Sequence, residues 1–263
     1  MDLGLKGKAA FVAAASKGLG RAIAEELAAE GVDLFLCARG EDALMKTCDE
    51  IARSSGVRVE AMTADVSREA DTRAVVRAAI ARFGKVDILV TNAGGPPSGK
   101  FESLSPKAWK DAVDLTLMSV VNLTTEVVPG MKERRWGRII NVTSIAVKQP
   151  VEGLMLSNSL RSAVTGFAKT LANEVATFGI TVNNILPGYT RTERVEQLSD
   201  AAAKREGITR EAATARWESE IPMRRLGEPR EFGALAAFLA SERASYITGT
   251  SIPVDGGWIR SLL

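Results

Sequence analysis

The chain has 263 residues, of which 46% are hydrophobic and 25% charged, and its formal net charge is +2. This balance is typical of a globular protein, and so small a charge gives no reason to expect nucleic acid or an anionic membrane as a partner. The absence of histidine excludes histidine-based triads, and the two cysteines lack metal-ligand spacing, so we expect no metal site. No stretch approaches the ~20 apolar residues that span a bilayer, and the N-terminus does not resemble a signal peptide. We therefore expect a cytoplasmic protein.

The first predicted unit is a strand, a glycine-containing turn and a helix. Residues 8–12 form an apolar run typical of a buried parallel strand, and apolar residues recur at helical spacing over 22–28. Gly18 and Gly20 lie between them. Glycines let the backbone turn tightly and approach a diphosphate, while free N–H groups at the helix N-terminus attract the anion. This arrangement predicts a dinucleotide site.

The residues after the second predicted strand, 32–37, indicate which nicotinamide dinucleotide is bound. Sites that select NAD place an acid near this strand end to hold the ribose 2′-OH. Here Ala38 is followed by Arg39, and Lys17 adds a cation in the first turn. Because arginine and lysine suit a 2′-phosphate, the sequence favours NADPH over NADH. Ordinary surface positions for both cations are the alternative.

Strands and helices alternate along the rest of the chain. Further strands are predicted near 57–61, 86–90, 138–142, 180–186 and 247–254, and helices at 69–83, about 106–134, about 154–178 and 230–240. This rhythm predicts a single-domain Rossmann fold over 1–263, an α/β structure whose doubly wound, mostly parallel sheet has helices on both faces.

The segment from about 191 to 228 interrupts this alternation. It predicts two helices, 193–206 and 210–220, at the sheet edge where open α/β sheets bind ligands, so we expect a lid over the substrate. A plain helical hairpin that packs Trp217 and Ile221 into the core is the alternative. The excess of arginine in this segment suits an anionic substrate, whereas the glutamates among the arginines favour ordinary surface ion pairs.

Short motifs in a fixed order carry a resemblance to a known family. They are Gly18-Leu19-Gly20, Asp65-Val66, Asn92-Ala93-Gly94, Asn141-Val142-Thr143-Ser144, Pro187-Gly188, Thr248-Gly249 and Asp255-Gly256-Gly257. With these motifs, residues 5–258 resemble the short-chain dehydrogenase/reductase family, in particular its 3-oxoacyl-[acyl-carrier-protein] reductase-like branch. The resemblance implies an NADP(H)-dependent oxidoreductase that interconverts a small-molecule carbonyl and a secondary alcohol. It also implies a homotetramer or homodimer.

The resemblance further implies which residues contact the cofactor. Asp65-Val66 would flank the adenine, and the backbone of residues 92–94 would pass along the adenosine ribose. Pro187-Gly188 and Thr192 would hold the nicotinamide and its carboxamide. The complete predicted cofactor set is Ala14, Ser16, Lys17, Gly18, Leu19, Gly20, Arg39, Asp65, Val66, Asn92, Ala93, Gly94, Arg161, Pro187, Gly188 and Thr192.

The catalytic positions depart from the family pattern. Ser144, at the end of the fifth strand, would hydrogen-bond the substrate carbonyl. The family's tyrosine thirteen residues later is Ser157 here, and its lysine four residues further on is Arg161. Thr116 stands where an asparagine is usual. The first glycine of the turn is Ala14, and since its Cβ disfavours positive φ, we expect a slightly altered turn or a more distant diphosphate.

These substitutions leave the proton donor open. A serine hydroxyl is a far weaker acid than a phenol, and Arg161 keeps its proton, although it can retain the positive charge and the ribose hydrogen bonds. Tyr189, directly after Pro187-Gly188, is either a proton donor or, as we prefer, an aromatic wall. The predicted catalytic set is Ser144, Ser157, Arg161 and Tyr189.

The leading hypothesis is therefore an atypical NADP(H)-dependent oxidoreductase whose proton comes through water, Tyr189 or Ser157. Two alternatives stay open from the sequence. One is a non-redox NADP(H)-binding sensor or partner protein, suggested by the joint loss of tyrosine, lysine and asparagine. The other is a lyase or isomerase that reuses the pocket.

Overall fold

Seven parallel strands form one sheet in the order β3-β2-β1-β4-β5-β6-β7. The strands are β1 (Ala9–Ala13), β2 (Asp33–Ala38), β3 (Val59–Thr63), β4 (Ile88–Thr91), β5 (Gly137–Val142), β6 (Ile180–Pro187) and β7 (Ser251–Val254). The computed structural model describes residues 2–262. Strands β2 and β3 lie on one side of β1, and β4 to β7 lie on its other side, so the order of successive strands reverses between β1 and β4. The predicted doubly wound α/β fold is therefore confirmed.

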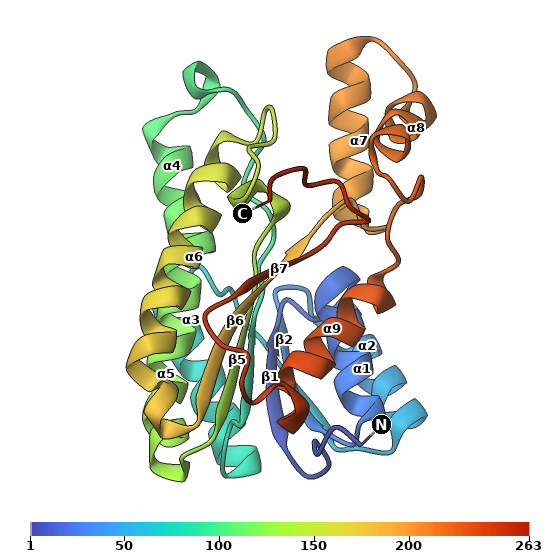
Figure 1. The fold of residues 1–263 in the computed structure, drawn as a ribbon. Coiled ribbons are helices and arrows are strands. Elements are labelled where there is room, and N and C mark those ends of the chain that lie inside the picture. Colours follow the sequence, from blue (N-terminus) through green and yellow to red (C-terminus); the bar gives the residue numbers. More distant parts are fainter. Residues whose placement is uncertain (1, 263) are drawn as a thin grey trace.

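Helices cover both faces of the sheet (Figure 1). The helices are α1 (Gly18–Ala29), α2 (Glu41–Ser55), α3 (Glu69–Phe83), α4 (Pro106–Val113), α5 (Ser119–Arg134), α6 (Met155–Val175), α7 (Glu193–Glu206), α8 (Arg210–Glu220) and α9 (Pro229–Ala240). In Figure 1, α1, α2 and α9 lie on one face and α3, α5 and α6 on the other, while α7 and α8 rise beyond the strand ends. Within residues 2–262, no helix is both long and apolar enough to cross a membrane.

Neighbouring residues of β1 point to opposite faces of the sheet and pack against the helices that cover each face. Val12 belongs to the buried cluster that contains Ile23 of α1 and Phe232 of α9. Phe11 belongs to the cluster that contains Leu123 of α5 and Ala168 of α6. Since both faces of the strand are buried, its sequence is continuously apolar instead of alternating.

Two predicted elements differ from the structure. The expected helix over 106–134 contains a π-helical stretch, Asp114–Met118, between α4 and α5. The expected strand over 247–254 begins only at Ser251, because Gly249 takes a positive φ of 68° and donates its N–H to the Val182 carbonyl instead of extending the strand. Helix α2 was not among the predicted helices. The other predicted boundaries agree with the observed ones to within a few residues.

A glycine sets how closely α1 and α9 approach each other. A Cβ built on Gly233 of α9 would lie 2.6 Å from the Ala22 carbonyl oxygen and 2.8 Å from Glu26 Cγ, both on α1. Such spacing leaves no room for a methyl group without a shift of one helix. The position of α1 therefore depends on this residue.

We predict that Gly233→Ala lowers the free energy of unfolding by ~1–3 kcal/mol, because overpacking displaces α1. Gly166→Ala is the matched control: this exposed glycine of α6 has no atom within 4 Å of the added Cβ. There alanine gains up to ~1 kcal/mol of helix propensity. Urea denaturation of both variants measures the difference, and equal stabilities would contradict the close approach.

Candidate active site

A pocket of about 940 Å³ opens at the carboxyl ends of the strands, where the strand order reverses. The residues that line it follow β1, β2, β3, β4, β5 and β6 and continue into α7. Every residue of the predicted cofactor and catalytic sets lines this pocket except Gly20. Motifs far apart in the sequence thus meet at the edge where open α/β sheets bind ligands.

The turn after β1 keeps a left-handed conformation in spite of its alanine. Ala14 has φ +50° and Gly18 has φ +59°. An L-residue in this region costs roughly 1–2 kcal/mol, so the chain accepts strain at Ala14 and retains the turn. The sequence expectation of an altered turn or a more distant diphosphate rested on a negative φ at Ala14, and this premise was wrong.

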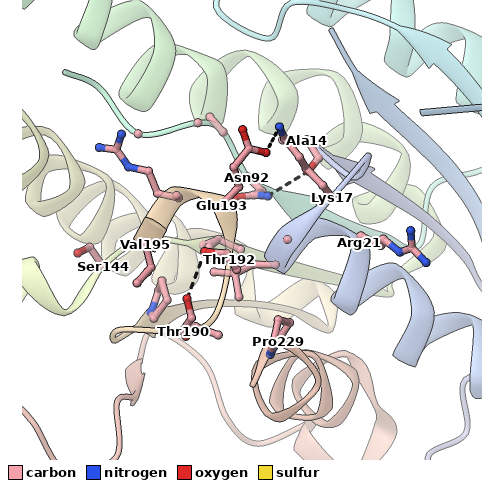
Figure 2. Close-up of a pocket in the computed structure, with 18 of the residues that line it drawn as sticks. Ala14, Lys17, Arg21, Asn92, Ser144, Thr190, Thr192, Glu193, Val195 and Pro229 are labelled. Atoms are coloured by element: carbon pink, nitrogen blue, oxygen red, sulfur yellow. Dashed lines mark hydrogen bonds and ion pairs between the residues drawn. The ribbon is translucent and has the colours of Figure 1, made fainter. Parts of the chain in front are cut away.

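Gly20 acts behind the turn and not in the pocket wall. A Cβ at this position would collide with the Ala14 carbonyl oxygen and would lie 2.9 Å from Asn92 Nδ2. Its glycine therefore lets the first turn of α1 sit directly against the ends of β1 and β4. Asn92 links these two ends, because its Nδ2 donates to the Ala14 carbonyl oxygen at 3.4 Å (Figure 2).

Asp65 and Arg39 lie where the adenosine half of a dinucleotide is predicted. Burial by itself would raise the pKa of Asp65, but hydrogen bonds from the Ser67 hydroxyl (2.7 Å) and backbone N–H (3.1 Å), with the Arg39 charge, lower it. Arg39 is exposed and lines the pocket. Within residues 2–262 it forms no ion pair at contact distance, so its guanidinium is available to a phosphate.

Lys17 joins the glycine turn to α7. Its Nζ forms an ion pair with Glu193, and both side chains are exposed (Figure 2). The neighbouring Thr192 places its Cγ2 3.6 Å from the Cβ position of Gly18. The start of α7 therefore rests on the glycine turn, and the predicted cation at Lys17 already has a carboxylate partner.

Ser144 and Arg161 both lie at the end of β5 and line the pocket. The Ser144 oxygen accepts the Ala146 N–H at 3.1 Å, which leaves its own O–H free to donate. Arg161 Nη1 donates to the Val142 carbonyl oxygen at 2.9 Å. Burial and, after it, the positive charge of Arg194 lower the pKa of Arg161 to about 10, so Arg161 stays charged at neutral pH. Ser157, one turn before Arg161 on α6, is buried.

Thr116 lies in the π-helical stretch beside this group. Its Oγ1 is buried and has no hydrogen-bond partner among the residues described. With Asn92 and Arg161, Thr116 lines a second, much smaller cavity. The sequence marked Thr116 only as a departure from the family, because helical periodicity does not reveal a π-helical turn.

Tyr189 forms part of an aromatic wall. Its ring stacks on Trp217 with centroids 4.5 Å apart, and Trp258 meets it edge-on at 5.9 Å. Burial and, after it, the charge of Glu220 raise the pKa of Tyr189 to about 12. The phenol is therefore a weaker acid than an ordinary tyrosine, which favours the wall over the proton donor. Trp217 and Ile221 of the hairpin pack into this small cluster, not into the main core.

Most arginines of the 191–228 segment have carboxylate partners. The ion pairs are Arg191 with Glu218 and Glu228, Arg205 with Glu206, Arg210 with Asp200, Arg216 with Glu206 and Glu220, and Arg225 with Glu231. Arg194 differs, because it lines the pocket and donates to the Pro96 carbonyl oxygen at 3.0 Å. The sequence counted Arg194 among the others, since only the fold separates it from them.

Comparisons with known proteins agree with this geometry. A family model described as enoyl-(acyl carrier protein) reductase matches residues 13–259. The 3-oxoacyl-[acyl-carrier-protein] reductase of Vibrio cholerae is 36% identical over 255 residues, which cover 97% of this chain and 98% of the relative. D-beta-hydroxybutyrate dehydrogenase of Cupriavidus necator is 36% identical over 263 residues, with 97% and 99% covered. The crystal structure of L-sorbose reductase from Gluconobacter frateurii, complexed with NADPH and L-sorbose, matches with a TM-score of 0.94 at 35% identity over 100% of both chains.

The sheet order, the glycine turn and the pocket at the strand ends define a dinucleotide-binding α/β protein. More closely, the chain belongs to the short-chain dehydrogenase/reductase family and to its 3-oxoacyl-[acyl-carrier-protein] reductase-like branch. The predicted resemblance is confirmed, and with it the prediction of an NAD(P)-dependent oxidoreductase that acts on carbonyl and alcohol groups.

We predict that Tyr189→Phe keeps kcat/KM for a ketone within about threefold of the natural protein, because the stacked ring area is retained. Loss of a proton donor would instead cost ~10²–10⁴-fold. Tyr189→Ala, which removes the wall itself, is the comparison variant and should raise KM. Steady-state oxidation of NADPH measures kcat and KM of both variants. A large drop in kcat for Tyr189→Phe would show instead that Tyr189 donates the proton.

Proposed function

We propose that this protein is an NADP(H)-dependent oxidoreductase that interconverts a carbonyl and a secondary alcohol with an atypical catalytic set. One observation carries the proposal: Ser144 follows β5, Arg161 bonds the Val142 carbonyl at the end of β5, and both line the same pocket as the predicted cofactor residues. The named relatives, two reductases and a dehydrogenase, support the reaction class.

The residues of the pocket fit NADP(H). The left-handed turn at Ala14 and Gly18 and the start of α1 form an anion cradle that a Cβ on Gly20 would disrupt. Arg39 would hold the 2′-phosphate, because its side chain is exposed, lines the pocket and forms no ion pair within residues 2–262. The related L-sorbose reductase was crystallised with NADPH. NADP(H) is accordingly the cofactor, with Pro187-Gly188 and Thr192 placed for the nicotinamide half.

The catalytic side chains supply binding and charge. Bound NADPH supplies the hydride for the carbonyl carbon. Ser144 donates its free O–H to the carbonyl oxygen, and Arg161 provides a fixed positive charge near the oxygen that becomes an alkoxide, as well as hydrogen bonds to the ribose. Arg161 does not release its own proton. The proton that completes the alcohol therefore comes from water or through Ser157, and not from Tyr189.

The 191–228 segment acts as a lid in this proposal, because its first helix rests on the glycine turn through Glu193 and on residue Pro96 through Arg194.

The two alternative functions, a non-redox sensor and a lyase or isomerase, are not favoured, since the named relatives are reductases and a dehydrogenase. Assembly as a homotetramer or homodimer and a cytoplasmic location stay predictions.

We predict that Arg39→Ala weakens NADPH binding by ~10–100-fold and leaves NADH binding unchanged, because one charged hydrogen-bonding group to the 2′-phosphate is lost. Arg53→Ala is the matched control: this arginine of α2 donates to the Asp49 carbonyl oxygen on its own helix. Fluorescence titration with both nucleotides measures the effect. Equal weakening for NADPH and NADH would contradict the role of Arg39.

We predict that Ser144→Ala lowers kcat/KM for ketone reduction by ~10²–10³-fold, the usual effect of losing a donor to a developing oxyanion. The dissociation constant for NADPH should not change. Ser162→Ala, an exposed serine of α6 whose hydroxyl bonds the Asn158 carbonyl, is the control. NADPH oxidation across ketoses, 3-oxo thioesters and 3-oxo acids is the measurement. Unchanged turnover in Ser144→Ala would overturn the proposed role.

A further inference from the structure

Two partly buried guanidinium groups lie close enough in the pocket to interact electrostatically, and neither has a carboxylate partner. Arg161 lies on α6 and Arg194 on α7, and both are only partly exposed. Neither forms an ion pair with any carboxylate in residues 2–262, in contrast to five of the other arginines of the 191–228 segment. An incompletely solvated charge without a counter-ion is unfavourable, so this part of the pocket is built to receive an anion.

Arg194 is held in place but keeps most of its donors free. One N–H of Nη2 bonds the Pro96 carbonyl oxygen at 3.0 Å, and a guanidinium has five N–H groups. A Cβ on Gly95 would lie 2.6 Å from Nη2 and 2.7 Å from Nε, so the guanidinium packs directly on this glycine. The remaining donors can make the paired hydrogen bonds that arginine forms with a carboxylate.

The carboxylates of the pocket are used elsewhere. Glu25 pairs with Arg21, Glu193 pairs with Lys17, and the Asp65 oxygen accepts two bonds from Ser67. Burial and, after it, the positive charge of Arg194 lower the pKa of Arg161, and no carboxylate of the described residues offsets these effects. An anion that neutralises this pair has to arrive with a ligand.

We propose that Arg194 binds a carboxylate group of the substrate, so that the enzyme selects oxo acids or the corresponding hydroxy acids. This inference rests on the proposed function, because it names the substrate class of the same site. Arg194 is a specificity-determining residue here: it recognises the acid group while Ser144 binds the carbonyl oxygen. Arg161 contributes the second charge.

The test compares oxo acids with their methyl esters, which differ only in the charge that Arg194 would recognise. The probes are 2-oxobutanoate, 3-oxobutanoate and 4-oxopentanoate. They differ in the number of carbons between the ketone and the carboxylate, so they also measure which spacing the site accepts. We expect the natural protein to prefer the best acid over its ester. Arg194→Met should lower kcat/KM for that acid by ~10–100-fold, the usual effect of losing a charged hydrogen-bonded pair, and should leave the ester within about threefold.

Three further variants separate recognition from folding or lid effects. Arg210→Met removes an exposed arginine of the same segment that pairs with Asp200 and does not line the pocket, so it should change kcat/KM for neither the acid nor the ester. Arg194→Lys should recover part of the acid preference. Gly95→Ala keeps the Arg194 charge but displaces its guanidinium, so it should reproduce the acid-selective loss.

Binding measurements keep the two proposals distinguishable. Thermal shifts of the NADP⁺-loaded protein with acid and ester report recognition without turnover. If no probe is reduced but the acid stabilises the natural protein and not Arg194→Met, the oxidoreductase proposal fails and this inference holds. The inference is overturned if Arg194→Met weakens NADPH binding, or if it weakens binding of the acid and the ester equally. It is also overturned if the natural protein prefers no acid over its ester. In each of these cases the proposal of ketone reduction can still hold.

Discussion

The close approach of α1 to the ends of β1 and β4 is the constraint on which the site depends. Gly20 permits this approach, because a side chain there would collide with the Ala14 carbonyl oxygen. On its other side α1 is packed against α9 through Gly233. With the helix fixed from both sides, its first residues Gly18 and Leu19 line the pocket, and Thr192 and Glu193 rest on the same turn. The proposed cofactor cradle and the start of the proposed lid would therefore share one backbone geometry.

Charge is the second organising feature. Arg39, Arg161 and Arg194 line the pocket, whereas its carboxylates are engaged by Arg21, Lys17 or Ser67. A dinucleotide phosphate and an acidic substrate would supply the missing negative charge. In the proposed function, Arg161 would fit this arrangement, because a permanently charged guanidinium stabilises an oxyanion by its field alone. The proposed mechanism would accordingly depend more on fixed charge than on a proton relay through a tyrosine.

Periodicity and motif order were enough to predict the fold and most pocket residues. Motifs at strand ends meet in space, since parallel strands bring their carboxyl ends to one edge, and this places Asp65, Asn92, Ser144 and Pro187 together. What could not be predicted depends on tertiary contact. The left-handed Ala14, the packing role of Gly20 and the late start of the last strand after Gly249 follow from the neighbouring backbone. Likewise, only the loop after β4 sets Arg194 apart from its paired neighbours.

The two attachments of the 191–228 segment differ in chemistry, and this difference decides which side can move. Near α8, Tyr189 stacks on Trp217 and meets Trp258, so separation would expose apolar ring surface to water. Near the start of α7, Val195 belongs to the same apolar cluster, but Glu193 and Arg194 add polar attachments, the Lys17–Glu193 pair and the bond to the Pro96 carbonyl. Water or an anion can replace the exposed pair at little cost. In the proposed function, ligands would therefore compete with the protein's own polar contacts on the α7 side. Binding of an anion to Arg194 there would exchange weak polar attachments for stronger charged ones and would leave the aromatic cluster in place.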